Sequence, residues 1–350
     1  MKKINIEILN KPTSYDIIIG RNLLNEVKNL IPDQSKYSMN VIIFDSNIDS
    51  NTLDNIKILF NDALFISIDL TNSKKSFEQF LDIQKALMKY NVDRNSLILS
   101  LGGGSTGDLV AFIASTYNRG VDYVHIPTTL LAMIDSSIGG KTGLDLEDGK
   151  NLIGSFYHPQ LVIVDTNFLL TLRKEEVTSG LFEAIKYGVA FDLELFLFIK
   201  ENINDLYSIN ILTKIIKWCC QIKTDIIMKD EKDNNIRNKL NFGHTIGHAI
   251  ESIYNIRHGE AVAYGMLCAA YLSRDNNTLD NNELDEIVKL INHFDLPEIV
   301  FDIKKILEQL SKDKKRINGK NNFILLNSIG DSYISDNVKI DLIKNSISNL

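Results

Sequence analysis

The sequence predicts two domains, an α/β N-terminal domain built on a parallel sheet and a mainly α-helical C-terminal domain. Three observations lead to this prediction. A chain of 350 residues is long for one compact core. Short apolar strands alternate with helical patterns over residues 1–172, which is typical of parallel α/β sheets. Over residues 173–350, long helical patterns dominate.

In the first domain the predicted strands are short apolar runs that end at polar or turn residues. Alternating apolar residues at 4–9 and 15–19 predict an opening pair of strands. The further strands are expected at residues 40–44, 63–70, 96–101, 123–126 and 161–164. Helices are expected at 77–90 and directly after the glycine-rich run at 102–108.

The second domain is predicted from apolar residues that recur with the helical period. Its helices are expected at residues 174–190, 193–202, 209–230, 241–254, 260–274, 282–294 and 303–312. Apolar residues 323–326, after the turn-like pair Asn318-Gly319, predict one small hairpin strand. Because no low-complexity linker interrupts the chain, we expect the two domains to pack closely around one cleft.

The overall composition excludes some classes of function. A formal net charge of −7 argues against a nucleic acid partner, although a local cluster of cations could still bind a small anionic substrate. Cys219 and Cys220 are adjacent and Cys268 is distant, so no disulfide framework is expected, and a cytoplasmic location fits best. The sequence has no signal peptide pattern and no apolar run long enough to span a membrane.

Residues Gly102, Gly104 and Gly107 form a G-x-G-x-x-G pattern between a predicted strand and a predicted helix. In this setting the glycines let the backbone approach a pyrophosphate, and the helix N-terminus supplies N–H donors. The alternative is a tight strand-to-helix turn without a ligand. No acid ends the next strand at the usual distance, so Asp45, at the end of an earlier strand, is the better candidate to bind ribose hydroxyls.

The run Gly140-Lys141-Thr142 resembles the end of a P-loop, but Asp135 stands where that motif needs a glycine. We therefore reject an ATPase. The surrounding glycine-rich stretch still gathers Asp135, Lys141, Lys150 and Asn151, which suits an anionic ligand. The alternative, a solvated surface loop, fits the acidic residues 145–149 better than the rest.

Glu183 and Lys186 are three residues apart on one predicted helix face. Such a pair is most often a surface ion pair that contributes only a few tenths of a kcal/mol. The pair deserves weight here because its neighbours Phe182, Ile185 and Tyr187 are apolar or aromatic.

Three of the six histidines, His244, His248 and His258, lie within fifteen residues. The first two are one helical turn apart, as in H-E-x-x-H zinc proteases, but Thr245 occupies the position of the catalytic glutamate. Buried structural histidines are the alternative. The spacing alone predicts a metal site with all three histidines as ligands.

Seven stretches together resemble the 3-dehydroquinate synthase family, part of the sugar phosphate cyclase superfamily, in family order along nearly the whole chain. They are LGGGSTGDLVAF, TYNRGVDYVHIPTTLLAMIDSSIGGKTG, GKNLIGSFYHP, EAIKYG, LNFGHTIGHAIE, HGEAVAYGM, and DKK followed by FILLNSIG. The resemblance implies a Rossmann-like NAD-binding domain and a helical metal-binding domain, with NAD and one divalent metal, usually zinc, with cobalt as the alternative. It also implies Glu183, His244 and His258 as metal ligands, with His248 facing the substrate instead.

The resemblance carries further residues to this chain. Those implied to contact NAD are Asp45, Lys75, Gly103, Gly104, Ser105, Asp108, Thr128, Thr129, Lys141, Lys150, Phe168, Thr171, Leu172 and Glu176. Those implied to contact the substrate are Asp135, Lys141, Asn151, Lys186, Lys223, Arg237, Asn241, His248 and Lys314. Arg119 matches an arginine that reaches the neighbouring subunit's site, which implies a homodimer.

One departure from the family pattern is visible. Asn72 stands where the family usually has a glutamate, three residues before Lys75, so the resemblance implies an altered NAD affinity with the site retained. Either Lys314 or its neighbour Lys315 is expected to face the substrate.

The implied reaction converts 3-deoxy-D-arabino-heptulosonate 7-phosphate to 3-dehydroquinate and phosphate. It proceeds by transient oxidation with NAD, phosphate elimination, re-reduction and aldol closure. The rival functions are a cyclase that makes a cyclitol, a polyol dehydrogenase of the glycerol dehydrogenase type, and a non-catalytic metal- and nucleotide-binding protein. Arg237, Asn241 and His248 favour a substrate that carries a carboxylate.

Overall fold

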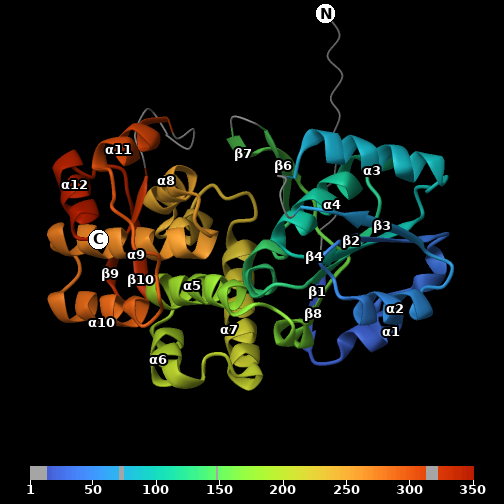
Figure 1. Ribbon diagram of the computed structural model, residues 1–350, viewed down its shortest axis with the longest axis horizontal. Helices are drawn as coiled ribbons and strands as arrows, with labels where there is room; N and C mark the ends of the chain where they lie inside the picture. The colour runs from blue at the N-terminus through green and yellow to red at the C-terminus, as the bar shows by residue number, and fades with distance from the viewer. Residues whose placement is uncertain (1–13, 71–74, 147–148, 313–321) are drawn as a thin grey trace, which may run out of the picture.

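The structure is a computed structural model that describes residues 14–70, 75–146, 149–312 and 322–350. The predicted strand at 4–9 lies outside the described residues, as do the side chains of Lys150 and Lys312. The sheet with its helices forms one side of the molecule, and a group of long helices forms the other (Figure 1). This arrangement confirms the predicted fold class, whereas the exact domain limits, 1–172 and 173–350, stay a prediction.

Six parallel strands form the sheet of the first part. In spatial order they are β1 (Asp16–Gly20), β8 (Leu161–Asp165), β5 (Tyr123–Pro127), β4 (Leu97–Gly102), β2 (Asn40–Asp45) and β3 (Leu64–Ile68). The three central strands β4, β5 and β8 are buried along their whole length, as expected where helices cover both faces of a parallel sheet.

Helices cover this sheet and close its two apolar cores. They are α1 (Val27–Leu30), α2 (Ser50–Leu59), α3 (Phe77–Lys89) and α4 (Gly104–Thr116). A capping box formed by Ser76 and Gln79 fixes the start of α3. Val110 and Ile113 of α4 pack in one apolar cluster with Val41 and Ile98 of the sheet, which holds α4 against the strands.

The second part consists mainly of helices. They are α5 (Lys174–Phe191), α6 (Leu193–Glu201), α7 (Ile209–Lys229), α8 (His244–Tyr254), α9 (His258–Asp275), α10 (Asn281–Asn292), α11 (Ile303–Lys312) and α12 (Ile340–Ser348). The predicted strand at 323–326 lies in β9 (Phe323–Ser328), which forms a hairpin with the following strand β10 (Asp331–Ser335), and the predicted turn at Asn318-Gly319 lies outside the described residues. No helix of the described ranges is both long and apolar enough to cross a membrane.

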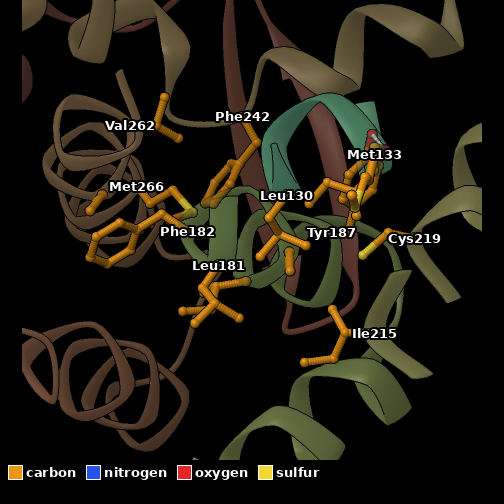
Figure 2. Packing of buried hydrophobic residues seen from close by; sticks show 14 of the residues in the cluster. Leu130, Met133, Leu181, Phe182, Tyr187, Ile215, Cys219, Phe242, Val262 and Met266 are labelled. Atoms are coloured by element: carbon orange, nitrogen blue, oxygen red, sulfur yellow. Dashed lines mark hydrogen bonds between the residues drawn. The ribbon is translucent and has the colours of Figure 1, made fainter. Parts of the chain in front are cut away.

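One apolar cluster joins the two parts of the molecule. Leu130 and Met133, which follow β5, lie close to Leu181 and Tyr187 of α5 and to Cys219 of α7 (Figure 2). A short π-helical turn, η4 (Ala132–Ser136), continues this segment and ends beside α7. The sheet and the helices therefore share a core, and residues from both meet at this junction.

The structure corrects several sequence predictions. The glycine-rich stretch after Lys141 forms an antiparallel hairpin, β6 (Lys141–Leu146) and β7 (Gly149–Phe156), which the sequence did not predict. The segment 15–19 forms most of β1 and pairs in parallel with β8, while its predicted partner strand at 4–9 lies outside the described residues. Helix α8 begins at His244 rather than residue 241, because the preceding 3-10 turn ends at Asn241 and the N-cap residue Gly243, with a φ of 77°, is not helical.

Candidate active site

The glycine-rich turn joins β4 to α4 at the carboxyl edge of the sheet. Gly103 precedes the helix, and Gly104 and Ser105 begin its first turn. The backbone N–H of Thr128, which follows β5, donates to the carbonyl of Gly102 at 3.0 Å. The strand order reverses between β2 and β4, and ligands of such sheets bind at this reversal point. The turn is therefore a well-placed nucleotide phosphate site.

Most residues that were expected to contact NAD surround this turn. Asp45 ends β2 and accepts a hydrogen bond of 3.1 Å from the Thr106 hydroxyl. Lys75 is buried and forms an ion pair with Asp108 of α4. Phe168 and Thr171 follow β8, at the same edge of the sheet, and Glu176 begins α5. The structure thus brings Asp45, Lys75 and Asp108 to this turn and places the other three after β8, while contact of these residues with a nucleotide remains a proposal.

His125 of β5 lies directly beneath the start of α4. A Cβ atom placed on Gly107 would collide with the imidazole Nε2, so only glycine fits at the last position of the G-x-G-x-x-G pattern. The ring is buried, and its Nε2 has no hydrogen-bond partner among the described residues. Burial lowers the pKa of His125 from 6.5 to about 4.

This buried histidine predicts part of the acid sensitivity of the fold. Between pH 6.5 and about 4 the unfolded chain holds a proton on His125 that the folded chain does not hold. As the pH is lowered through this window, the free energy of unfolding should therefore fall by about 1.4 kcal/mol per pH unit because of His125 alone. In His125→Gln, the drop in melting temperature from pH 7 to pH 5 should be smaller than in the unmodified protein.

The exposed His293 provides the control, because His293→Gln removes a histidine without removing a buried one. That variant should show the same drop in melting temperature as the unmodified protein. An equal drop in His125→Gln would contradict the assigned role of His125.

The three histidines of the second part meet at one point. His244 and His248 lie on α8, and His258 is the first residue of α9. One ligand atom from each ring lies within 4.8 Å of the other two. Glu183 of α5 adds a completely buried carboxylate, whose Oε1 lies 3.3 Å from Nε2 of His244 and 3.3 Å from Nε2 of His258. The geometry thus accommodates both predicted ligand sets, the three histidines and the set with Glu183.

The ring orientations favour a cation between Glu183 and two of the histidines. Nδ1 of His244 lies 3.0 Å from the carbonyl of Phe242, which can only accept a hydrogen bond. Nδ1 of His258 lies 3.0 Å from a carboxylate oxygen of Glu251. With one ring proton held on each Nδ1, both Nε2 atoms face the carboxylate of Glu183 and are the nitrogens that can offer lone pairs to a metal. Three lone pairs that converge in this way suit a divalent metal.

A buried positive charge already accompanies Glu183. The Lys186 ammonium lies 2.6 Å from Oε2 of Glu183, and both side chains are at most 1% exposed. Burial alone would raise the pKa of Glu183, but Lys186 and His244 hold it well below its usual value. Burial alone would likewise lower the pKa of His258, but the carboxylates of Glu183 and Glu251 raise it to about 9. The site therefore favours positive charge next to Glu183 and His258.

Asp135, at the junction of the two parts, connects the sheet to the helical site. Its Oδ1 accepts hydrogen bonds from the Tyr187 hydroxyl at 2.9 Å and from the Lys223 ammonium at 2.6 Å. Burial alone would raise the pKa of Asp135, but Lys223 and Lys186 lower it, so the carboxylate is ionised. Burial lowers the pKa of Lys223, while the carboxylates of Glu183 and Asp135 outweigh burial and raise the pKa of Lys186. Two lysines with different basicity thus flank one carboxylate.

Arg237 crosses from the helical part to the glycine-rich segment. Its guanidinium is buried and donates to the carbonyls of Gly139 and Glu231. A Cβ atom on Gly139, whose φ is 100°, would collide with the guanidinium. Lys141, two residues further along the chain, forms an ion pair with Asp233. The segment that resembled a P-loop therefore approaches the buried arginine closely.

The remaining predicted residues have different positions. Asn151 of β7 accepts a hydrogen bond from Lys75, so it lies at the nucleotide turn. Asn241 ends the 3-10 turn before α8, and its side chain donates to the carbonyl of Asn238. Arg119 is exposed beside the start of β5. Lys314 lies outside the described residues, as does the side chain of Lys150.

The sequence reasoning missed three residues of this site. Tyr187 was taken only as an aromatic neighbour, although its hydroxyl binds Asp135. Glu251 is three residues after His248 on α8, and that helical spacing was an available signal. Asp233 lies in a polar turn, and nothing in the local sequence indicates that it pairs with Lys141.

Two family models cover most of the chain. Residues 65–179 match the model described as 3-dehydroquinate synthase N-terminal, and residues 180–316 match 3-dehydroquinate synthase C-terminal. A 3-dehydroquinate synthase of Clostridium beijerinckii is 42% identical over 330 residues, which cover 92% of this chain and 94% of the relative. The chain belongs to the 3-dehydroquinate synthase family. It is therefore an enzyme with 3-dehydroquinate synthase activity, and the resemblance noted in the sequence is confirmed.

Solved structures of related cyclases share this fold. The 2-epi-5-epi-valiolone synthase of Streptomyces hygroscopicus, solved with NAD⁺ and Zn²⁺, has a TM-score of 0.88 at 24% identity and covers 99% of this chain and 98% of its own. A 2-deoxy-scyllo-inosose synthase, complexed with carbaglucose-6-phosphate, NAD⁺ and Co²⁺, has a TM-score of 0.86 at 26% identity and covers 96% of both chains. The 3-dehydroquinate synthase family thus shares its architecture with cyclases that act on other substrates.

Proposed function

We propose that this chain converts 3-deoxy-D-arabino-heptulosonate 7-phosphate to 3-dehydroquinate and phosphate at the junction of its two parts. Because the carbon–oxygen bond to phosphate is broken, the enzyme acts as a carbon–oxygen lyase. One observation carries the proposal. Glu183 meets His244 and His258 at one point. Buried cations, including Lys186 and Lys223, lie beside this group.

The proposed metal is a divalent ion, zinc with cobalt as the alternative, held by Glu183, His244 and His258. NAD is proposed to bind at the glycine-rich turn. When bound, the metal supplies a Lewis acid and NAD supplies a transient hydride acceptor. The cofactors in the two solved cyclases support this choice.

The chain's own residues would bind and orient an anionic substrate. Lys186 stays protonated because Glu183 and Asp135 stabilise its charge, so it acts as a fixed cation. Lys223 and Arg237 add two further buried cations, which suits a substrate with a carboxylate and a phosphate. Lys141 would exchange its ion pair with Asp233 for an anionic group of the substrate.

Asp135 and His248 are proposed to meet the hydroxyl groups of the substrate. Tyr187 and Lys223 fix one oxygen of Asp135, so its carboxylate is held in place to accept a hydrogen bond. The ring of His248 lies 5.1 Å from that of His244, one turn along α8, which suits a proton donor or acceptor next to the metal ligands. Asn151, Asn241 and Lys314 complete the proposed substrate contacts.

Assembly and location also remain proposals. The exposed Arg119 would reach the site of a second copy in a homodimer. All three cysteines are free and buried, which supports the expected cytoplasmic location. The net charge of −7 continues to argue against a nucleic acid partner.

Phosphate release tests the proposed substrate. The purified protein with NAD and zinc should release phosphate from the heptulosonate 7-phosphate far faster than from sedoheptulose 7-phosphate, because the latter has no carboxylate for the buried cations to bind. A preference for the substrate without the carboxylate would favour the cyclitol-forming alternative.

A further inference from the structure

The ring nitrogen of His258 that points away from Glu183 contacts a carboxylate that the proposed mechanism does not use. Nδ1 of His258 lies 3.0 Å from Oε2 of Glu251. Glu251 lies in the last turns of α8, and three residues separate α8 from α9, which begins with His258. Asn255, with a φ of 52°, ends α8 in the left-handed conformation and turns the chain back. This turn places the carboxylate of one helix against the first ring of the next.

The contact determines which nitrogen of His258 is available to a metal. An ionised carboxylate only accepts hydrogen bonds, so Nδ1 carries the proton and donates it to Glu251. Nε2, 3.3 Å from Oε1 of Glu183, is then the nitrogen that can give up its proton and offer a lone pair to a metal. If the proton moved to Nε2, that atom would become a donor and could not bind a metal.

The two histidines of the proposed ligand set are oriented by different groups. His244 donates from Nδ1 to the neutral backbone carbonyl of Phe242, which no side-chain substitution removes. His258 donates to a negatively charged side chain, and this charge makes the opposite nitrogen a stronger electron donor. The strength of metal binding through His258 therefore depends on a residue outside the ligand set.

We propose that Glu251 is a positioning residue, which fixes the tautomer and the ring orientation of His258 and thereby strengthens metal binding. This inference rests on the proposed ligand role of His258. It predicts a loss of metal affinity when Glu251 loses its charge, even though all ligand atoms remain.

The test compares two glutamine variants. Glu251→Gln keeps the size of the side chain but removes its charge. Glu231→Gln is the matched control, because Glu231 also pairs with a histidine, His158, at 3.1 Å, away from the three-histidine cluster. The zinc dissociation constant is measured by competition with a fluorescent chelator, and the cobalt-loaded protein is compared by visible absorption.

Glu251→Gln should bind zinc about 10- to 100-fold more weakly than the unmodified protein. Its cobalt spectrum should change, because the donor strength of His258 changes. Glu231→Gln should keep the zinc affinity and the cobalt spectrum of the unmodified protein.

Two results would overturn the inference in distinguishable ways. An unchanged zinc affinity in Glu251→Gln, or a loss no larger than that in Glu231→Gln, would overturn the role of Glu251 alone. An unchanged zinc affinity in His258→Ala would overturn the proposed ligand set and, with it, this inference.

Discussion

The His258→Ala variant is expected to lose bound metal and catalytic activity together. The proposed metal ligands are Glu183, Nε2 of His244 and Nε2 of His258. Removal of His258 leaves two of them, fewer than a catalytic zinc site normally has. Since a metal contributes several kcal/mol to such catalysis, activity should fall at least about 1,000-fold. Metal content after dialysis and phosphate release would be measured on the same sample.

An exposed histidine provides the control for this variant. His293→Ala should retain both metal and activity, because His293 lies outside the three-histidine cluster. Circular dichroism of both variants would show that the helices remain folded. A His258→Ala protein with its full metal content would refute the ligand role of His258.

The second large effect is expected for Arg237→Ala, in which substrate binding should weaken while NAD and zinc stay bound. Arg237 is 2% exposed, and its Nη1 and Nη2 donate to the carbonyls of Glu231 and Gly139. Its remaining N–H groups can donate to an anion. Charge-assisted hydrogen bonds contribute about 1.5–3 kcal/mol each, so the KM should rise roughly 10- to 100-fold or more.

Lys232→Ala is the matched control, because it removes a cation from the same turn. Lys232 is about half exposed and pairs with Glu231, so its loss should change the KM little. Arg237→Lys keeps the charge but loses the planar guanidinium with its several N–H donors. Its KM should lie between those of the unmodified protein and Arg237→Ala. Unchanged steady-state kinetics in Arg237→Ala would contradict the assignment of Arg237.

The parallel sheet could be predicted because its inner strands are largely buried. Such strands appear as continuous apolar runs, as in Asn40–Asp45 and Leu97–Gly102, and the runs are easily separated from amphipathic helices. The order of the strands could not be predicted. β1 pairs with β8, although Ile163 lies 145 residues after its partner Ile18, and no local pattern encodes such a pairing.

The hairpin of β6 and β7 was missed for a different reason. Gly143 and Gly154 face each other across it, and each lies so close to the opposite backbone that a side chain would not fit. Glycine is depleted in strands and usually marks turns, so the composition favoured a loop. The requirement for close backbone approach appears only when the two strands are paired.

The candidate site could be predicted only in part. The spacing of His244, His248 and His258 indicated a metal cluster, which the geometry accommodates. Nothing in the spacing could add Glu183, which precedes His244 by 61 residues on another helix. Its pairing with Lys186 resembled a surface ion pair until the fold showed that both side chains are buried. Family resemblance supplied Glu183, and the described contacts explain why a carboxylate suits that place.

The most direct test of this account follows phosphate and NADH together. The protein loaded with NAD and zinc should release phosphate from 3-deoxy-D-arabino-heptulosonate 7-phosphate without net accumulation of NADH, because the hydride returns in each turnover. A chelator should stop phosphate release, and added zinc should restore it. Stoichiometric accumulation of NADH would instead indicate a polyol dehydrogenase, and phosphate release that is insensitive to the chelator would contradict the proposed metal site.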